Sequence, residues 1–405
     1  MRILIANWHR NTVGGAESYL RALIPGLLER GHEVALVHGY QTTIDRETID
    51  LPEHQLPRWC YEELGIQALL NGISQWKPEV VYSQGMESPD LELALLDDYP
   101  CVLFAHGYYG TCATGSKCHA WPHRTPCSRA FGPMCLILHY PRRCGGLNPL
   151  TTWNNYRQQA QRHGLLGRFK AVLVASRHMY REMENNGLDP NRLHLAPLPP
   201  TDMTPEVEAP APRVPKGTIL MLSRLTASKG GDYLIRAIPE ASRKLNRPLQ
   251  LVVAGSGSEE SKLRALASKL GISAQFIGWV SGARRRDVIR NSDLVAFPSL
   301  WPEPFGLTGI EAASLGIPAV GFAVGGIPEW LHAGISGELA PGSPPTSDGL
   351  SQAIVRALEN PKHYHDLSTG AWNLSRQFSL RMHLDKLEAV LSLAAETAPS
   401  AVPLS

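Results

Sequence analysis

The chain has 405 residues, of which 43% are apolar and 19% are charged, and its formal net charge is +2. This length exceeds what one hydrophobic core usually supports, so we expect two α/β domains of roughly 200 residues each. The near-neutral charge gives no reason to expect a disordered chain or a general binder of polyanions. We therefore expect no nucleic-acid partner.

The first apolar run, residues 1–7, is too short for a signal peptide and is typical of a buried first strand. The most apolar long stretch, residues 305–328, contains Glu311 and many glycines and would be a poor membrane span. We expect a cytoplasmic protein with reduced cysteines, at most peripheral at the membrane.

Short apolar runs alternate with longer helix-patterned segments, which is typical of parallel sheets wrapped by helices. In the first half, strands are expected at residues 2–6, 33–38, 79–83, 101–106, 171–176 and 193–196. In the second half, they are expected at residues 218–223, 250–254, 274–278, 294–298, 319–323 and 337–340. Each half should therefore form its own sheet.

Residues 199–216 contain six prolines and almost no apolar pattern, which indicates an extended linker. We place an N-terminal domain at 1–200, the linker at 201–216 and a C-terminal domain at 217–378. A helical pattern over 380–395 has no strand after it, so we expect the segment 379–405 to form a helix that packs back on the N-terminal domain, followed by a frayed tail.

Two acidic residues follow the expected strand at 294–298. Glu303 lies in a loop, and Glu311 lies two turns inside a helix expected to start near Phe305. Eight positions at helical rise span about 12 Å, comparable to the separation of the ribose and the hexose in a nucleotide sugar. The backbone of residues 306–309 would offer free N–H groups to the diphosphate between them. The alternative is an ordinary helix in which Glu303 complements the dipole.

Two basic residues, Arg224 and Lys229, follow the first strand of the second half, where loops form the ligand crevice of such folds. Fixed cations there would stabilise the charge that develops on a departing nucleoside diphosphate. The chain has no Asp-x-Asp pair that would hold a divalent cation on that diphosphate. We therefore expect neither a metal nor another cofactor. The alternative is a solvated turn.

With these motifs the chain resembles the retaining group 1 glycosyltransferases of the GT-B fold, whose Glu-x7-Glu motif is matched by Glu303 and Glu311. Similar segments follow in the order of the family at residues 11–17, 29–34, 253–257, 276–280 and 318–329. The resemblance implies two Rossmann-like domains that face each other across a cleft. Residues 196–202 depart from the family's Pro-x-Gly-Val-Asp stretch, which leaves contacts between the domains there in doubt.

The resemblance also implies roles for individual residues. Glu303 would contact the transferred sugar and Glu311 the ribose, while Arg224 and Lys229 would bind the diphosphate. His106 would lie near the donor sugar, or would only hydrogen-bond the Gly107 turn. The remaining donor-binding residues would be Gly14, Gly15, Gly257, Trp279, Phe305, Gly306 and Leu307.

These roles predict transfer of a hexose from a UDP- or GDP-linked donor to a glycan or lipid-linked acceptor, with retention and without a metal. Two alternatives stay open: a non-catalytic nucleotide-sugar or lipid-binding module, and a nucleotide-sugar epimerase or phosphorylase of the same architecture. A dehydrogenase is disfavoured because no Gly-x-Gly-x-x-Gly follows the first strand.

The middle of the chain is basic, because residues 99–181 contain no Asp or Glu. The same span holds eleven cations: Lys117, Arg124, Arg129, Arg142, Arg143, Arg157, Arg162, Arg168, Lys170, Arg177 and Arg181. If no acid compensates them, these cations would give the N-terminal domain, which usually receives the acceptor in this fold, a positive electrostatic field. An anionic acceptor or an anionic membrane surface follows as a hypothesis, and a scattered solvated surface is the alternative.

A cysteine-rich insert lies in this span, near residues 107–150. Five of the seven cysteines fall within it, close to three histidines: Cys112, Cys118, Cys127, Cys135, Cys144, His119, His123 and His139. The spacing contains no Cys-x2-Cys pair, so a zinc site, free thiols in a flexible loop and disulfides all stay open.

Overall fold

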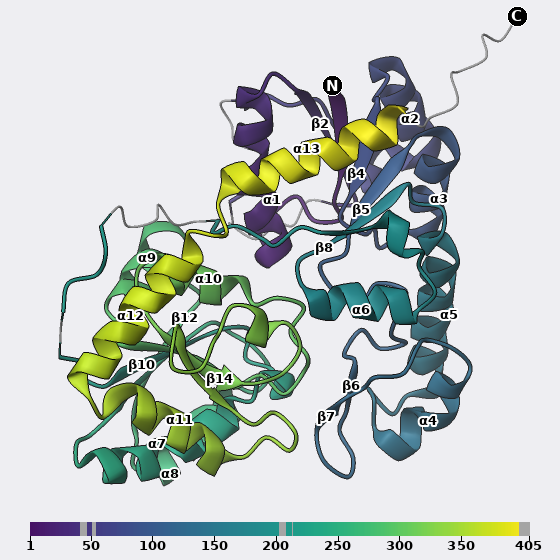
Figure 1. Cartoon of the computed structure of the whole chain (residues 1–405). Coiled ribbons are helices and arrows are strands. Elements are labelled where there is room, and N and C mark those ends of the chain that lie inside the picture. Colours follow the sequence, from purple (N-terminus) through teal and green to yellow (C-terminus); the bar gives the residue numbers. More distant parts are fainter. Residues whose placement is uncertain (41–46, 51–53, 202–207, 213, 397–405) are drawn as a thin grey trace, which may run out of the picture.

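The computed structural model describes residues 1–40, 47–50, 54–201, 208–212 and 214–396. The chain forms two lobes, each built on a parallel sheet with helices on both faces (Figure 1). This confirms the predicted pair of Rossmann-like domains. The described part of the linker has no helix or strand, and the expectations for residues 202–207, 213 and 397–405 lie outside the described residues.

The first sheet has the strand order β3-β2-β1-β4-β5-β8-β9. Its strands are β1 (Arg2–Ala6), β2 (Glu33–His38), β3 (Arg58–Cys60), β4 (Val80–Ser83), β5 (Cys101–Phe104), β8 (Ala171–Val174) and β9 (Leu193–Leu195). The second sheet has the order β12-β11-β10-β13-β14-β15. Its strands are β10 (Thr218–Leu222), β11 (Gln250–Ala254), β12 (Ser273–Gly278), β13 (Leu294–Phe297), β14 (Ala319–Phe322) and β15 (Gly337–Ala340).

All twelve predicted strands are present, and several of them end one or two residues earlier than predicted. Strand β3 was missed because its three residues are too few to show a period.

The helices of the first lobe are α1 (Gly15–Glu29), α2 (Tyr61–Trp76), α3 (Pro89–Asp98), α4 (Met134–Arg142), α5 (Pro149–Leu166) and α6 (Arg177–Asn185). Those of the second lobe are α7 (Gly231–Leu245), α8 (Glu260–Lys269), α9 (Gly282–Arg290), α10 (Leu307–Ser314), α11 (Ser347–Leu358) and α12 (Pro361–Ser375), and the last helix is α13 (Leu380–Glu396).

The continuous apolar run of β1 is explained by its central place between β2 and β4. Ile3 and Ile5 face one side of the sheet, where α1 and α13 pack, and Leu4 and Ala6 face the other. All four are fully buried, as parallel strands covered on both faces require.

The last helix returns to the first lobe. Helix α13 packs on α1, β4 and β5 and so lies across the N-terminal sheet (Figure 1). Gly26 of α1 permits this close packing, since a Cβ there would lie 2.6 Å from Leu384 Cδ1. An ion pair from Arg30 and a hydrogen bond from His32 to Glu388 add to the contact.

The insert contains regular structure: a short hairpin of β6 (Cys118–His119) and β7 (Thr125–Pro126), followed by α4. Its five cysteines are free and partly buried, so the free-thiol alternative is the one of the three that agrees with the structure. Among the residues the structure describes, no three His, Cys, Asp or Glu are grouped so that they could hold a metal ion.

The prediction of eleven uncompensated cations was wrong for at least two of them. Lys117 is buried in an ion pair with Glu182 at 2.5 Å, and Arg168 pairs with Asp97 at 2.6 Å. Asp97 and Glu182 both lie outside the acid-free span 99–181. The sequence pattern did not predict these pairs, because only the folded chain brings the acids next to Arg168 and Lys117.

None of the described helices is long and apolar enough to cross a membrane.

Candidate functional site

A cavity of about 450 Å³ opens between the two sheets and is lined from both lobes. The N-terminal lobe contributes the start of α1 and His106, which follows β5. The C-terminal lobe contributes Arg224 after β10, Ser299 after β13 and the segment 303–308. These loops follow the carboxyl ends of parallel strands, where ligands bind in such folds.

Two helices begin at this cavity from opposite lobes. Helix α1 begins after Gly14 and helix α10 after Gly306, and a Cβ on Gly15 would lie only 3.7 Å from Leu307 Cδ2. Gly306 has φ +99°, which a residue with a side chain rarely adopts. Helix α10 therefore starts at Leu307, two residues after the start predicted near Phe305. The first N–H groups of both helices are suited to an anion held between the lobes.

Lys229 and Glu303 form an ion pair within the cavity wall, with Nζ 2.5 Å from Oε1. The Ser299 hydroxyl donates to the same oxygen at 2.6 Å, and the ammonium group lies 5.1 Å from the centre of the Trp301 ring. Glu303 is buried, and Lys229 is only 16% exposed. The two predicted groups therefore meet directly, and the cation is held by a carboxylate.

The Glu303 loop is fixed through its backbone. Gly325 has φ +58°, and a Cβ there would lie 2.4 Å from Glu303 N. The Gly326 N–H donates to Glu303 O at 2.7 Å. A side chain on Gly325 would push the loop away, which is the physical reason for a glycine at this position.

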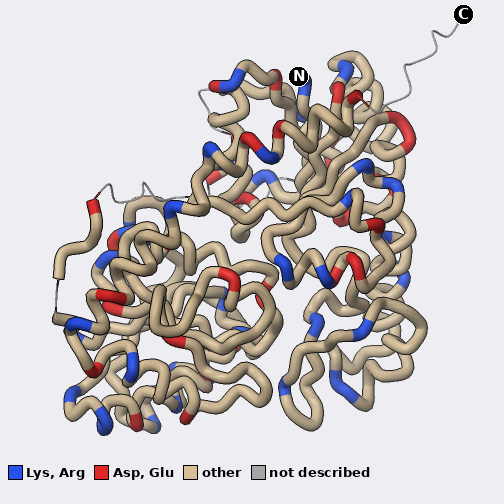
Figure 2. Tube along the Cα trace, in the orientation of Figure 1, with Lys and Arg blue, Asp and Glu red and all other residues tan. Residues whose placement is uncertain are grey.

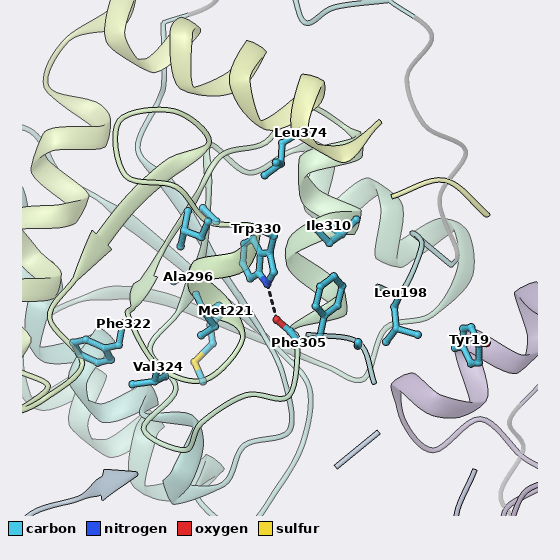
Figure 3. Packing of buried hydrophobic residues seen from close by; sticks show 14 of the residues in the cluster. Tyr19, Leu198, Met221, Ala296, Phe305, Ile310, Phe322, Val324, Trp330 and Leu374 are labelled. Atoms are coloured by element: carbon cyan, nitrogen blue, oxygen red, sulfur yellow. Dashed lines mark hydrogen bonds between the residues drawn. The ribbon is translucent and has the colours of Figure 1, made fainter. Parts of the chain in front are cut away.

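Trp330 fixes the start of α10. Its Nε1–H donates to Phe305 O at 2.5 Å, and Figure 3 shows the ring packed beside α10 with Phe305 and Ile310 nearby. Gly309 makes room for this ring, because a Cβ there would lie 2.1 Å from it. Gly309, the last residue of the predicted anion-binding segment 306–309, thus serves packing against Trp330.

Glu311 lies behind the cavity wall and does not line the cavity. It is fully buried, and its Oε1 accepts from Thr201 Oγ1 at 2.8 Å. Its Oε2 is paired with Arg285, which also donates to Thr308 Oγ1 at 3.1 Å and does line the cavity. Arg285 was missed, although the run of arginines at 284–286, shortly after the family-like segment 276–280, was a visible signal.

The other predicted donor residues divide between the cavity and its support. Arg224, Trp279 and Phe305 line the cavity, and Arg224 and Trp279 are exposed. Gly257 does not line it: a Cβ there would lie 2.3 Å from Leu225 O, so this glycine allows two loops to pack closely.

His106 lies two residues beyond the end of β5, and not at the strand end as predicted. Its Nε2 bonds Gln84 Oε1 at 2.7 Å, and its ring packs on Phe104 and Tyr19. Burial lowers the pKa of His106 to about 3, with a smaller contribution from His383. The imidazole is therefore neutral near pH 7, with Nε2–H donating to Gln84.

A second histidine, His383 of α13, lies next to this group and was not predicted. Its Nε2 is 2.7 Å from the Tyr19 hydroxyl, which is also 2.7 Å from that of Tyr82. Its Nδ1 is 2.9 Å from Pro197 O, just before the linker. Burial lowers the pKa of His383 to about 4, so a neutral ring ties α13 and the linker to the residues behind His106.

Contacts between the lobes hold both flanks of Glu303. Tyr108 donates to Pro302 O at 2.6 Å, and Ser176 donates to Pro304 O at 2.5 Å. The carboxylate of Glu329 accepts from the N–H groups that open α6, at 2.7 and 2.8 Å. No local pattern marks these contacts, because each joins residues more than a hundred positions apart.

Comparisons with known proteins match both lobes. The family described as Glycosyltransferase Family 4 matches residues 13–199, and the family described as Glycosyl transferases group 1 matches residues 204–373.

Curated relatives match part of the chain. An uncharacterised glycosyltransferase of Methanocaldococcus jannaschii is 35% identical over 144 residues, 35% of this chain and 36% of that protein. D-inositol 3-phosphate glycosyltransferase 2 of Catenulispora acidiphila is 34% identical over 170 residues, 40% of this chain and 39% of the relative. A component of the phosphatidylinositol N-acetylglucosaminyltransferase of Arabidopsis thaliana is 28% identical over 204 residues, 49% of this chain and 44% of the relative. Each match thus spans less than half of the relative.

Solved structures match the fold over nearly the whole chain. HepE of Anabaena, in complex with UDP and glucose, has a TM-score of 0.69 at 17% identity, covering 97% of this chain and 100% of that one. Sucrose-phosphate synthase of Thermosynechococcus elongatus has a TM-score of 0.71 at 18% identity, covering 98% and 100%. At these identities the likeness shows the fold alone.

Proposed function

Because this chain belongs to the group 1 glycosyltransferases, we propose that it moves a hexose from a nucleotide-diphosphate sugar to a glycan or lipid-linked acceptor, with retention of configuration and without a metal ion. The observation that supports this most is the Lys229–Glu303 pair, placed in a cavity that two helix N-termini face from opposite lobes.

The donor would lie between the lobes. Its diphosphate would take the place next to Lys229, Arg224 and the N–H groups of α1 and α10, which favour negative charge. The sugar would reach Glu303, whose Oε2 has no bond to Lys229 or Ser299 in the structure. Trp279 would offer an exposed ring beside the base of a UDP or GDP donor.

The residues of this chain would act mainly on charge. As the bond from the sugar to the diphosphate breaks, negative charge develops on the phosphate oxygen, and the ammonium of Lys229 stabilises it. The acceptor hydroxyl attacks on the face that the diphosphate leaves, and a diphosphate oxygen takes its proton. The neutral imidazole of His106 orients a sugar hydroxyl and carries no charge into the site.

Glu311 would act through Arg285 and not by direct contact with the ribose. Its carboxylate is shared between Arg285 and Thr201, so a ribose hydroxyl could reach it only after one of these moved. We propose that Glu311 positions Arg285 at the cavity wall.

The acceptor class is supported by the relatives, several of which carry inositol 3-phosphate or phosphatidylinositol in their names. We propose a glycolipid acceptor on that basis. A panel of UDP- and GDP-linked sugars, tested with lipid-linked and free glycan acceptors, identifies the donor and the acceptor class.

Slow donor hydrolysis without acceptor would separate an enzyme from a binding module, and conversion of the donor to its epimer would support the epimerase alternative.

A further inference from the structure

Large apolar side chains are exposed in unusual concentration on the cysteine-rich insert. Of the fifteen that the described residues expose, seven fall within residues 121–153, and they are 42% to 74% exposed. They are Trp121, Met134, Ile137, Tyr140, Leu147, Leu150 and Trp153. Single exposed apolar residues are ordinary, but a cluster of this size marks an interaction surface.

Helix α4 turns its apolar stripe to solvent. Met134, Ile137 and Tyr140 are three positions apart and share one face. The buried residue of this helix is His139, whose Nε2 bonds Gly146 O at 2.8 Å and Thr152 Oγ1 at 3.1 Å. A surface helix normally buries its apolar face, but here Leu136 and Leu138 are only partly buried while the stripe lies in solvent, which favours a partner outside the chain.

Leu150 and Trp153 of α5 are again three positions apart, and Leu147 lies two residues before this helix begins. Stacked rings join α5 to the segment just before α4, since the ring of Trp153 lies 6.2 Å from that of Tyr156, which lies 5.1 Å from that of Phe131. Trp121 lies at the end of α4, where its N–H donates to Arg142 O. Helices α4 and α5 also contact each other, so the seven side chains lie on or beside one pair of neighbouring helices.

Basic residues border this surface. Arg142, Arg143 and Arg157 are exposed, and the guanidinium of Arg143 lies 5.4 Å from the centre of the Trp121 ring. Figure 2 shows Lys and Arg along the insert, which has no acidic residue of its own. Figure 1 places the insert at the end of the first lobe far from α13.

We propose that this face, which we call the insert face, docks on an anionic lipid surface. Exposed aliphatic and tryptophan side chains beside arginines suit an interface where acyl chains meet negative headgroups. A soluble acidic glycan would leave Ile137, Leu147 and Leu150 in water, and a second copy of the chain would bring like charges together. The inference rests on the proposed glycolipid acceptor, which the insert face would bring to the cleft.

The test uses co-sedimentation of the full chain with phosphatidylcholine vesicles, with and without roughly one third phosphatidylglycerol. We expect binding only to the anionic vesicles. The double variant Leu147→Ser with Leu150→Ser should bind roughly tenfold more weakly or worse. Arg142→Gln and Arg143→Gln should each weaken binding about fivefold at low salt, and less at high salt.

A matched control replaces two exposed leucines outside the insert, Leu64→Ser with Leu93→Ser, and should bind like the wild type. Thermal melting of each variant verifies folding. Equal binding to neutral and anionic vesicles, no binding at all, or no effect of the insert leucines would overturn the inference. So would a wild-type dimer that the insert substitutions dissociate.

Donor hydrolysis without vesicles keeps this inference apart from the proposed function. It should be unchanged in the insert variants. Hydrolysis without vesicle binding would refute docking alone, whereas vesicle binding without hydrolysis or transfer of any donor would refute the proposed function.

Discussion

The two sides of the cleft treat their charged residues differently. In the C-terminal lobe, Lys229 and Arg285 are mostly buried and each is held by a carboxylate. In the insert of the N-terminal lobe, arginines such as Arg142 and Arg143 lie in solvent beside exposed apolar side chains. Charges fixed by partners suit a ligand of defined geometry, whereas exposed charges suit a diffuse, salt-sensitive surface.

The largest effect is expected at the fixed pair. Lys229→Ala should abolish transfer, with a loss of at least about 10³-fold in kcat, because it removes the cation next to the leaving diphosphate. Melting should show an intact fold. Glu303→Gln, which keeps the side-chain shape, should reduce kcat to a similar degree. Turnover near the wild-type level in either variant would contradict the assignment of the donor pocket.

Glu311→Ala should also abolish transfer while the fold survives, but by a different route. It removes the carboxylate that holds Arg285, so Arg285→Ala should reproduce the loss. If Glu311 instead bound the ribose directly, Arg285→Ala would leave the KM for the donor nearly unchanged. Steady-state kinetics on both variants and the double variant measure this, since two residues that act as one unit give non-additive effects.

Part of the candidate site was predictable from the sequence and part was not. The strand pattern and the carboxyl-end loops placed Arg224, Lys229 and Glu303 at one cavity, because period and loop position are local properties. The Glu311–Arg285 pair and the Glu182–Lys117 pair were not predicted, because each joins segments that are distant in the sequence and meet only in the folded chain. The exposure of the seven apolar residues of the insert was also not predicted, because the sequence does not show which face of a helix lies in solvent.

Gly325→Ala should have a smaller effect. It places a Cβ 2.4 Å from Glu303 N at φ +58°, which should cost about 1–3 kcal/mol of unfolding free energy and displace the Glu303 loop. We expect a Tm lower by several degrees and a reduced kcat. Gly334→Ala is the matched control: its φ is +74°, but a Cβ there meets nothing within 4 Å. Equal effects of both on kcat would show that loop position does not matter.

The smallest effect concerns pH. The pKa of His383 is about 4 in the folded chain and about 6.5 when unfolded, so the unfolded chain binds more protons between these values. Its stabilising contribution is present above pH 6.5 and is lost as the pH falls toward 4, by about 2 kcal/mol between pH 7 and pH 5. The titratable groups near His383 are Tyr19, His106 and Lys386.

Chemical denaturation of the wild type and His383→Gln at several pH values measures this contribution. The variant should be less stable at pH 7 and should lose less stability on acidification. Parallel loss in both proteins would assign the pH dependence to other groups.

The most direct test of the donor site is a calorimetric comparison of a nucleoside with its diphosphate, uridine with UDP and guanosine with GDP, on the wild type and Lys229→Ala. If Lys229 binds the diphosphate, Lys229→Ala should weaken binding of the preferred diphosphate at least about tenfold and leave binding of its nucleoside unchanged. Equal affinity of both proteins for the diphosphate would contradict it.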